Sequence, residues 1–249
     1  MYKRLLVFLS FKLLVLISVA NAGEIRIATA TNFYPTLEKI KLNYEGISAN
    51  KVTIIKGSTS SLYDQIIKGE SYDIFLSADS IHVDKLVKKG KCIDYEKDKK
   101  SLVYAIGRLV LWRADVDSSQ QLREQLNEGD FNKLAIANPK TELYGKASVE
   151  ALKAMELYDS LELKLTYAND VYQVRQLVQS GAADIGIVSR SYVNQDIYWE
   201  IDSYLHRPIK QKTAILKQSK HIEIARDFMQ YIQSPSIKKL IKSDGYGFE

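Results

Sequence analysis

The sequence is poor in cysteine: among its 249 residues, Cys92 is the only one. A single cysteine cannot form a disulfide within the chain, so we expect the buried core to stabilise the fold. No general base can be assigned near Cys92, and a cysteine nucleophile would need one. We therefore expect Cys92 to be a free structural thiol.

Catalytic and metal-binding patterns are also scarce. The three histidines, His82, His206 and His221, are far apart and lack the spacing of metal ligands. The chain has neither a G-x-S-x-G nucleophile elbow nor a G-x-x-x-x-G-K-[ST] phosphate loop. We expect no enzymatic activity, no cofactor and no metal held directly by protein ligands. A secreted serine hydrolase acting through Ser58 or Ser189 is a less favoured alternative, because no base can be assigned to either serine.

The net charge of the chain is also small. The formal net charge is +5, and Lys3, Arg4 and Lys12 contribute three of the positive charges. In the densest lysine cluster, residues 88–100, acidic residues are interspersed with the lysines, which is typical of a solvated surface. We therefore expect no nucleic-acid partner.

The first 22 residues have the pattern of a secretory signal peptide. Basic MYKR precedes the apolar run LLVFLSFKLLVLISVA, and Ala20-Asn21-Ala22 fits a cleavage site. An uncleaved membrane anchor is the alternative, but the run is short for a membrane span and Lys12 interrupts it. The residue directly after the cleavage site is not a cysteine that could carry a lipid. We predict a protein secreted through the inner membrane into the periplasm.

From residue 24, short β-type runs alternate with amphipathic helical patterns, which is typical of parallel sheets covered by helices. The first part has strands expected at 24–30, 51–57 and 73–79, and helices at 35–47, 61–70 and 80–90. Residues 101–115 form a long apolar run, which we interpret as one strand leaving a first lobe and entering a second. The second part has strands expected at 134–139, 164–170, 183–189 and 207–217, helices at 145–161 and 170–181, and C-terminal helices broken near Ser234 and Pro235.

Four expected strand-to-helix turns carry the candidate ligand groups. They are ATATNFYPT with Thr31 and Asn32, GSTSSLYDQ with Ser58 and Thr59, NPKTELYGKAS with Tyr144, and TYANDVYQV with Val171. A helix N-terminus offers unpaired backbone N–H groups and partial positive charge, so it can bind an anion without lysine or arginine. The simpler explanation is that such residues are ordinary helix caps. Four hydroxyls in a row after Gly57 exceed what one cap needs.

ATATNFYPTLEKI, GSTSSLYDQI and YDIFLSAD resemble the periplasmic molybdate-binding proteins, which are substrate-binding components of ABC transporters. The resemblance continues through LAIANPKTELYGKASVEAL, NDVYQVRQLVQSG and ADIGIVS to DFMQYIQSPSIKKLIKSDGYGF. It implies an α/β, type II-like periplasmic-binding-protein fold, with two lobes of mostly parallel sheet flanked by helices and joined by crossing strands. We expect residues 1–22 to be the signal peptide, residues 23–104 and 210–249 to form lobe 1, and residues 105–209 to form lobe 2.

The resemblance also implies the site and the function. Thr31 or Asn32 and Ser58 or Thr59 would bind molybdate from the first lobe, and Tyr144 and the backbone amide of Val171 from the second. Molybdate, and also tungstate, would pass to an ABC-type membrane permease, and the binding protein would be a monomer. Molybdenum would be present only as the oxyanion.

The sequence departs from many relatives at one ligand position. They have a tyrosine that reaches the anion at the end of the strand matching ADIGIVS, whereas this chain has Ser189. Tyr144 stands where those relatives have a small residue. Our hypothesis is that Tyr144 supplies the phenolic donor from a different turn.

A site made only of donors suits a fully deprotonated dianion. Hydrogen phosphate would bury a proton without an acceptor, at a cost of about 1–3 kcal/mol, whereas sulfate has no such proton. A binding protein for sulfate or another tetrahedral oxyanion is therefore the main alternative, and a secreted adhesin or structural domain is a third. We expect Asp170 to point away from the anion and to stabilise its own helix start.

Overall fold

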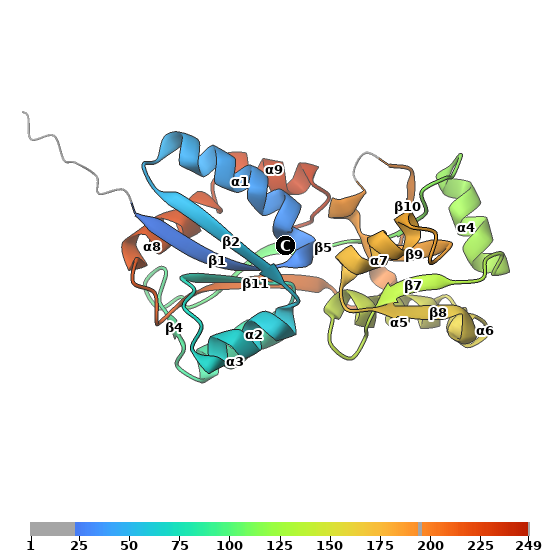
Figure 1. Cartoon of the computed structure of the whole chain (residues 1–249), viewed down its shortest axis with the longest axis horizontal. Helices are drawn as coiled ribbons and strands as arrows, with labels where there is room; N and C mark the ends of the chain where they lie inside the picture. Colours follow the sequence, from blue (N-terminus) through green and yellow to red (C-terminus); the bar gives the residue numbers. More distant parts are fainter. Residues whose placement is uncertain (1–22, 194–195, 249) are drawn as a thin grey trace, which may run out of the picture.

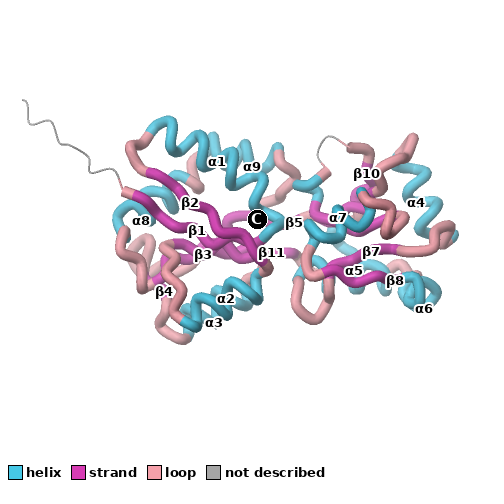
Figure 2. The backbone as a smooth tube through the Cα atoms, in the orientation of Figure 1, coloured by secondary structure: helices cyan, strands magenta, loops and turns pink. Residues whose placement is uncertain are grey.

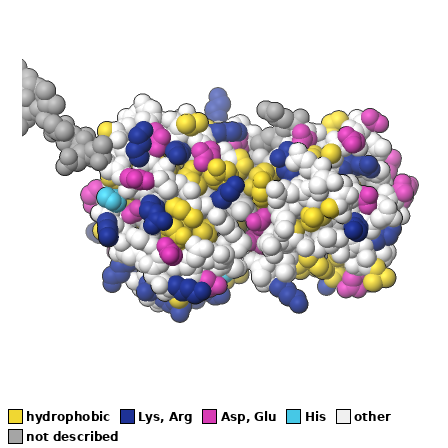
Figure 3. Space-filling model, viewed as in Figure 1, with side chains coloured by type: hydrophobic (Ala, Val, Ile, Leu, Met, Phe, Trp, Pro, Cys, Tyr) yellow, Lys and Arg dark blue, Asp and Glu magenta, His cyan; other side chains and the backbone are white. Residues whose placement is uncertain are grey.

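The computed structural model describes residues 23–193 and 196–248, so the predicted signal peptide lies outside the described residues. Two α/β lobes lie side by side along the long axis of the molecule (Figure 1). No helix in the described ranges combines the length and the hydropathy that a membrane span requires. On the face shown in Figure 3, acidic and basic side chains are scattered over both lobes.

The first lobe is built on a sheet with the order β2-β1-β3-β11-β4, and β5 also pairs with β11. Strands β1, β2 and β3 are parallel, whereas β11 runs antiparallel to β3, β4 and β5. The strands are β1 (Glu24–Ala30), β2 (Lys51–Gly57), β3 (Ile74–Ser77), β4 (Cys92–Ile93), β5 (Leu102–Gly107) and β11 (Ile209–Leu216).

The second lobe is built on a sheet with the order β10-β6-β9-β7-β8. Strand β7 is parallel to β8 and to β9, and β6 joins β9 and β10 by antiparallel pairing. The strands are β6 (Leu109–Trp112), β7 (Leu134–Ala137), β8 (Leu165–Ala168), β9 (Ile185–Ser189) and β10 (Tyr198–Glu200). Each sheet therefore has the predicted parallel strands on one side, β2-β1-β3 or β9-β7-β8, and strands paired antiparallel on the other.

Helices cover both sheets (Figure 2). In the first lobe, α1, α8 and α9 pack on one face, with Leu37 and Phe228 in their core, while α2 and α3 pack on the other, with Leu62 and Leu86. The helices are α1 (Tyr34–Ile47), α2 (Thr59–Lys68), α3 (Ile81–Lys88), α4 (Ser119–Glu128), α5 (Leu143–Ala154), α6 (Tyr158–Leu161), α7 (Val171–Gln179), α8 (Ile222–Tyr231) and α9 (Pro235–Ser243). Short 3₁₀ turns are η1 (Thr31–Phe33), η2 (Glu162–Lys164), η3 (Arg190–Tyr192) and η4 (Ser203–Leu205).

The long apolar run at 101–115 is not one strand. It divides at Arg108 into β5, which pairs with β11 in the first sheet, and β6, which pairs with β9 in the second. The run is apolar because most of the side chains in both halves are buried or half-buried. Its hydrogen-bonding partner, however, changes from β11 in the first sheet to β9 in the second. The chain crosses between the lobes here, and it returns just before β11.

Candidate functional site

The first predicted turn connects β1 to α1. Thr31 and Asn32 lie in η1 and are both buried. The sequence suggested that they could cap the helix, but this was wrong. The N-cap of α1 is Phe33, and no side chain makes a capping hydrogen bond there. Because the 3₁₀ turn precedes the helix, Asn32 is free to direct its amide to other partners.

At the second turn, the hydroxyls of Ser58 and Thr59 bond within the first lobe, and that of Ser60 bonds across to the second. Ser58 caps α2, because its Oγ accepts a hydrogen bond from the Ser61 backbone N–H at 3.2 Å. Thr59 is buried, and its Oγ1 accepts from the Ala78 N–H at 3.0 Å. Ser60 reaches the second lobe and donates to the carbonyl oxygen of Thr141 at 3.0 Å. The start of α2 therefore faces the 138–142 loop.

The third turn holds Tyr144, which lies in the first turn of α5 and is 1% exposed. Its phenolic oxygen accepts hydrogen bonds from Asn32 Nδ2 at 3.4 Å, from Gln211 Nε2 at 3.1 Å and from Ser189 Oγ at 3.1 Å. Burial raises the pKa of Tyr144 well above its ordinary value. The phenol is therefore neutral, and because these three neighbours donate to its oxygen, its own proton remains available for donation.

The fourth turn begins α7 with Val171, which is buried. Asp170 caps this helix by accepting a hydrogen bond from the Gln173 N–H at 2.9 Å, so it stabilises its own helix start as expected. Helix α7 packs beside η1, which brings the fourth turn close to the first.

Glu142 is a further polar residue at these turns, and the sequence reasoning missed it. It is the N-cap residue of α5 and is 6% exposed. Burial, with the negative charges of Asp170 and Asp79, raises the Glu142 pKa to about 8, while the Thr59 backbone N–H acts in the opposite direction. An acidic residue two positions before a predicted ligand tyrosine was the signal that could have found it.

A buried hydrogen-bond network surrounds Asn32 and Tyr144, and most of its members were also missed. Gln211 Oε1 accepts from Asn32 Nδ2 and from the Tyr104 hydroxyl, both at 2.9 Å. Tyr246 and Ser191 donate to the Asn32 carbonyl oxygen at 2.6 and 2.9 Å. Gln211 lies in β11 between Lys210 and Lys212, so the residues beside it in the sequence did not mark it as buried.

Only some of the six sequence-predicted residues contact one another in the structure. Asn32 and Tyr144 are in direct contact across the two lobes, and Thr31 accepts a hydrogen bond through its carbonyl oxygen from the Tyr192 hydroxyl. Ser58 and Thr59 face the loop that precedes α5, and no hydrogen bond among the described residues joins Val171 to the other five. The groups that gather here are hydroxyls, amides and backbone N–H groups, together with the Glu142 carboxyl.

The hydrolase alternative receives no support from this geometry. Within residues 23–193 and 196–248, the hydroxyls of Ser58 and Ser189 bond to Ser61, Tyr144 and Ser191, and neither is hydrogen-bonded to a histidine or a carboxylate. No cluster of metal-ligating residues occurs in the same ranges. Cys92 is buried, which raises its thiol pKa to about 12 and keeps it protonated.

The fold and the helix starts between its lobes define a two-lobed α/β solute-binding protein. The family model of bacterial extracellular solute-binding proteins matches residues 25–247, and the chain belongs to this family. The family consists of transport proteins that bind solutes and are not enzymes. The predicted two-lobed α/β fold is confirmed.

Within that family, several similar proteins share one description. The molybdate-binding protein ModA of Azotobacter vinelandii is 32% identical over 236 residues, which cover 92% of each chain. ModA of Rhodobacter capsulatus is 30% identical, covering 91% of this chain and 89% of its own. The solved structure of the Azotobacter vinelandii periplasmic molybdate-binding protein has a TM-score of 0.83 and 31% identity, covering 90% of this chain and 99% of that one. The predicted resemblance is confirmed.

Proposed function

We propose that this protein binds molybdate between its lobes in the periplasm and delivers it to an ABC-type membrane permease. Relatives described as molybdate-binding proteins, at about 30% identity over nine-tenths of the chain, support this proposal. We extend the proposal to tungstate, which has the same charge and shape. The protein would act as a monomer, with 23–104 and 210–249 as one lobe and 105–209 as the other.

The observation that carries the proposal is the neutral Tyr144 hydroxyl, buried in contact with Asn32 across the lobe junction. A dianion placed at this junction would meet hydroxyls and backbone N–H groups from four turns. In our proposal Thr31, Asn32, Ser58 and Thr59 bind it from one lobe, and Tyr144 and the Val171 amide from the other. Charge-assisted hydrogen bonds of this kind are short and strong, so binding needs no lysine or arginine.

The test is a thermal melt of the purified protein with molybdate, tungstate, sulfate and phosphate in turn. A ligand at a hundred times its dissociation constant adds about 2.7 kcal/mol of stability, which raises the melting temperature by several degrees for a chain of this size. We expect a rise with molybdate and tungstate only. If only sulfate raised the melting temperature, the site would bind sulfate in place of molybdate. If no oxyanion raised it, the proposed function would be contradicted.

A further inference from the structure

The inference concerns Glu142, and it rests on the function proposed above. Glu142 belongs to the third turn of the site, where it is the N-cap residue of α5, and its side chain faces the start of α2 at the second turn. One carboxyl oxygen, Oε1, is buried and has no hydrogen-bond partner among the described residues. Buried polar groups are almost always paired, so an unpaired carboxyl oxygen at a candidate ligand site indicates a missing partner.

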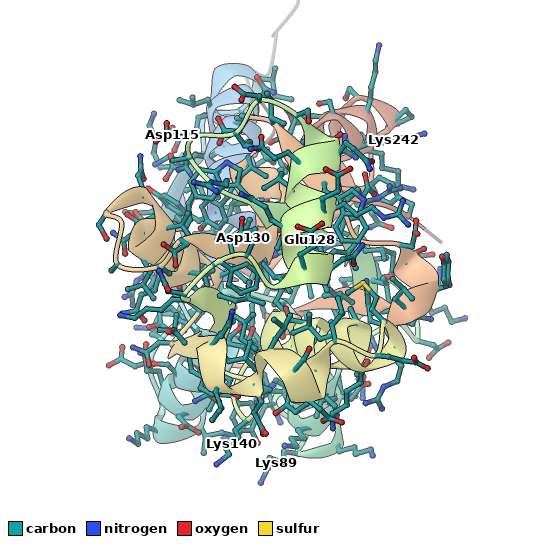
Figure 4. The ribbon with its side chains drawn as sticks, turned by 90° about the vertical axis from the view of Figure 1, so that its right-hand side faces the viewer. Lys89, Asp115, Glu128, Asp130, Lys140 and Lys242 are labelled. Atoms are coloured by element: carbon teal, nitrogen blue, oxygen red, sulfur yellow. The ribbon has the colours of Figure 1, made fainter. Side chains whose placement is uncertain are left out.

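The charges that face Glu142 are acidic. The negative charges of Asp170, at the start of α7, and of Asp79, which follows β3 and pairs with His82 at 2.7 Å, both disfavour the Glu142 carboxylate. From α2, the facing group is the Thr59 backbone N–H. Lys140 is nearby in the sequence, but its side chain points outward at the edge of the molecule (Figure 4). The surroundings therefore favour the neutral carboxylic acid over the carboxylate.

An arriving dianion would strengthen that preference. A carboxylate at this position would repel the dianion, because like charges in a buried site interact strongly. The neutral acid has an O–H that can donate a hydrogen bond, whereas the carboxylate can only accept one. An oxyanion would be the missing partner of Glu142 only if the carboxyl group carries a proton.

We propose that Glu142 is a specificity-determining residue of the anion site: its neutral carboxyl group donates a hydrogen bond to the bound oxyanion, so that anion binding is coupled to protonation of Glu142. In the free protein the proton is present below pH 8 and is lost above it, because the Glu142 pKa is about 8. The protonated fraction falls from about nine-tenths at pH 7 to about one-tenth at pH 9, so the apparent affinity falls about tenfold.

The experiment measures the dissociation constant of molybdate by titration calorimetry at pH 7 and pH 9, where molybdate keeps the same charge. The variants are the wild type, Glu142→Gln and Glu150→Gln. The amide introduced by Glu142→Gln keeps a donor but cannot titrate, so we expect the affinity of this variant to change less than twofold between the two pH values. Glu150 is a matched control in the same helix, where its carboxylate pairs with Arg207, and its variant should keep the tenfold loss.

A second measurement uses the wild type alone, so it does not depend on whether a variant folds. Titrations at pH 9 in two buffers of different ionisation enthalpy should show uptake of about one proton per molybdate. No proton uptake, or an equal pH dependence in Glu142→Gln, would overturn the role of Glu142 while leaving molybdate binding intact. Tighter binding by Glu142→Ala at pH 7 would also overturn it, because the side chain would then be a competitor. If the wild type binds no oxyanion at pH 7, the failure belongs to the proposed function itself.

Discussion

At the scale of single residues, Tyr144 combines two tasks. Its oxygen accepts hydrogen bonds from amides of Asn32 and Gln211, and in our proposal its proton goes to the anion. The sequence singled out this tyrosine at the third turn as a candidate ligand residue. It did not show Gln211, because that contact joins positions separated by 67 residues.

We expect Tyr144→Phe to weaken molybdate binding by about 0.5–3 kcal/mol, the range that spans neutral hydrogen bonds and those to charged groups. The matched control is Tyr204→Phe, because Tyr204 is 82% exposed and its hydroxyl bonds to the neighbouring Asp202. Isothermal titration of both variants with molybdate is the measurement. Equal molybdate affinities in the two variants would show that the Tyr144 hydroxyl does not bind the anion.

At the scale of elements, a close contact between α5 and β7 fixes the third turn. Gly145 lies in the first turn of α5, and a Cβ there would be 2.1 Å from the Ala137 carbonyl oxygen. The glycine therefore lets the helix approach the end of the strand, and this approach positions the neighbouring Tyr144. The sequence predicted the helix from residue 145, whereas it begins at Leu143. Glu142 thereby becomes the cap, a boundary shift that periodicity alone does not resolve.

We expect Gly145→Ala to destabilise the protein by about 1–3 kcal/mol, as overpacking of a close contact does, and to weaken molybdate binding by displacing Tyr144. The control is Gly46→Ala in α1, where a Cβ would have nothing within 4 Å. That substitution should be stabilising by about 0.5–1 kcal/mol, because alanine is the better helix former. Urea unfolding of the two variants gives the comparison, and an undiminished free energy of unfolding in Gly145→Ala would contradict the argument.

At the scale of the whole molecule, hydrogen bonds from η3 join the lobes. The hydroxyls of Ser191 and Tyr192 donate to the carbonyl oxygens of Asn32 and Thr31 in η1. These bonds link β9 of one sheet to β1 of the other through the turns that follow them. Hinge closure around a ligand is a common motion in two-lobed binding proteins, and these contacts form only when the lobes are together.

We therefore expect Tyr192→Phe to shift the unliganded protein toward an open form. The loss of one neutral hydrogen bond, about 0.5–1.5 kcal/mol, should weaken molybdate binding by roughly two- to tenfold. Small-angle scattering should show a larger radius of gyration without ligand and an unchanged one at saturating molybdate. A radius equal to that of the wild type without ligand would show that this bond does not hold the lobes together.

Local patterns in the sequence were enough to predict the alternation of strands and helices and the hydroxyl-rich turns at 31–32 and 58–59, because periodicity and capping chemistry are local. They also showed that Asp170 begins a helix. Tertiary contacts, in contrast, divide 101–115 into two strands, bring Asn32 to Tyr144, and bury Glu142. Those facts depend on distant segments of the chain, and the burial of a polar side chain follows from what packs over it. The same glutamate in an exposed loop would be an ordinary carboxylate.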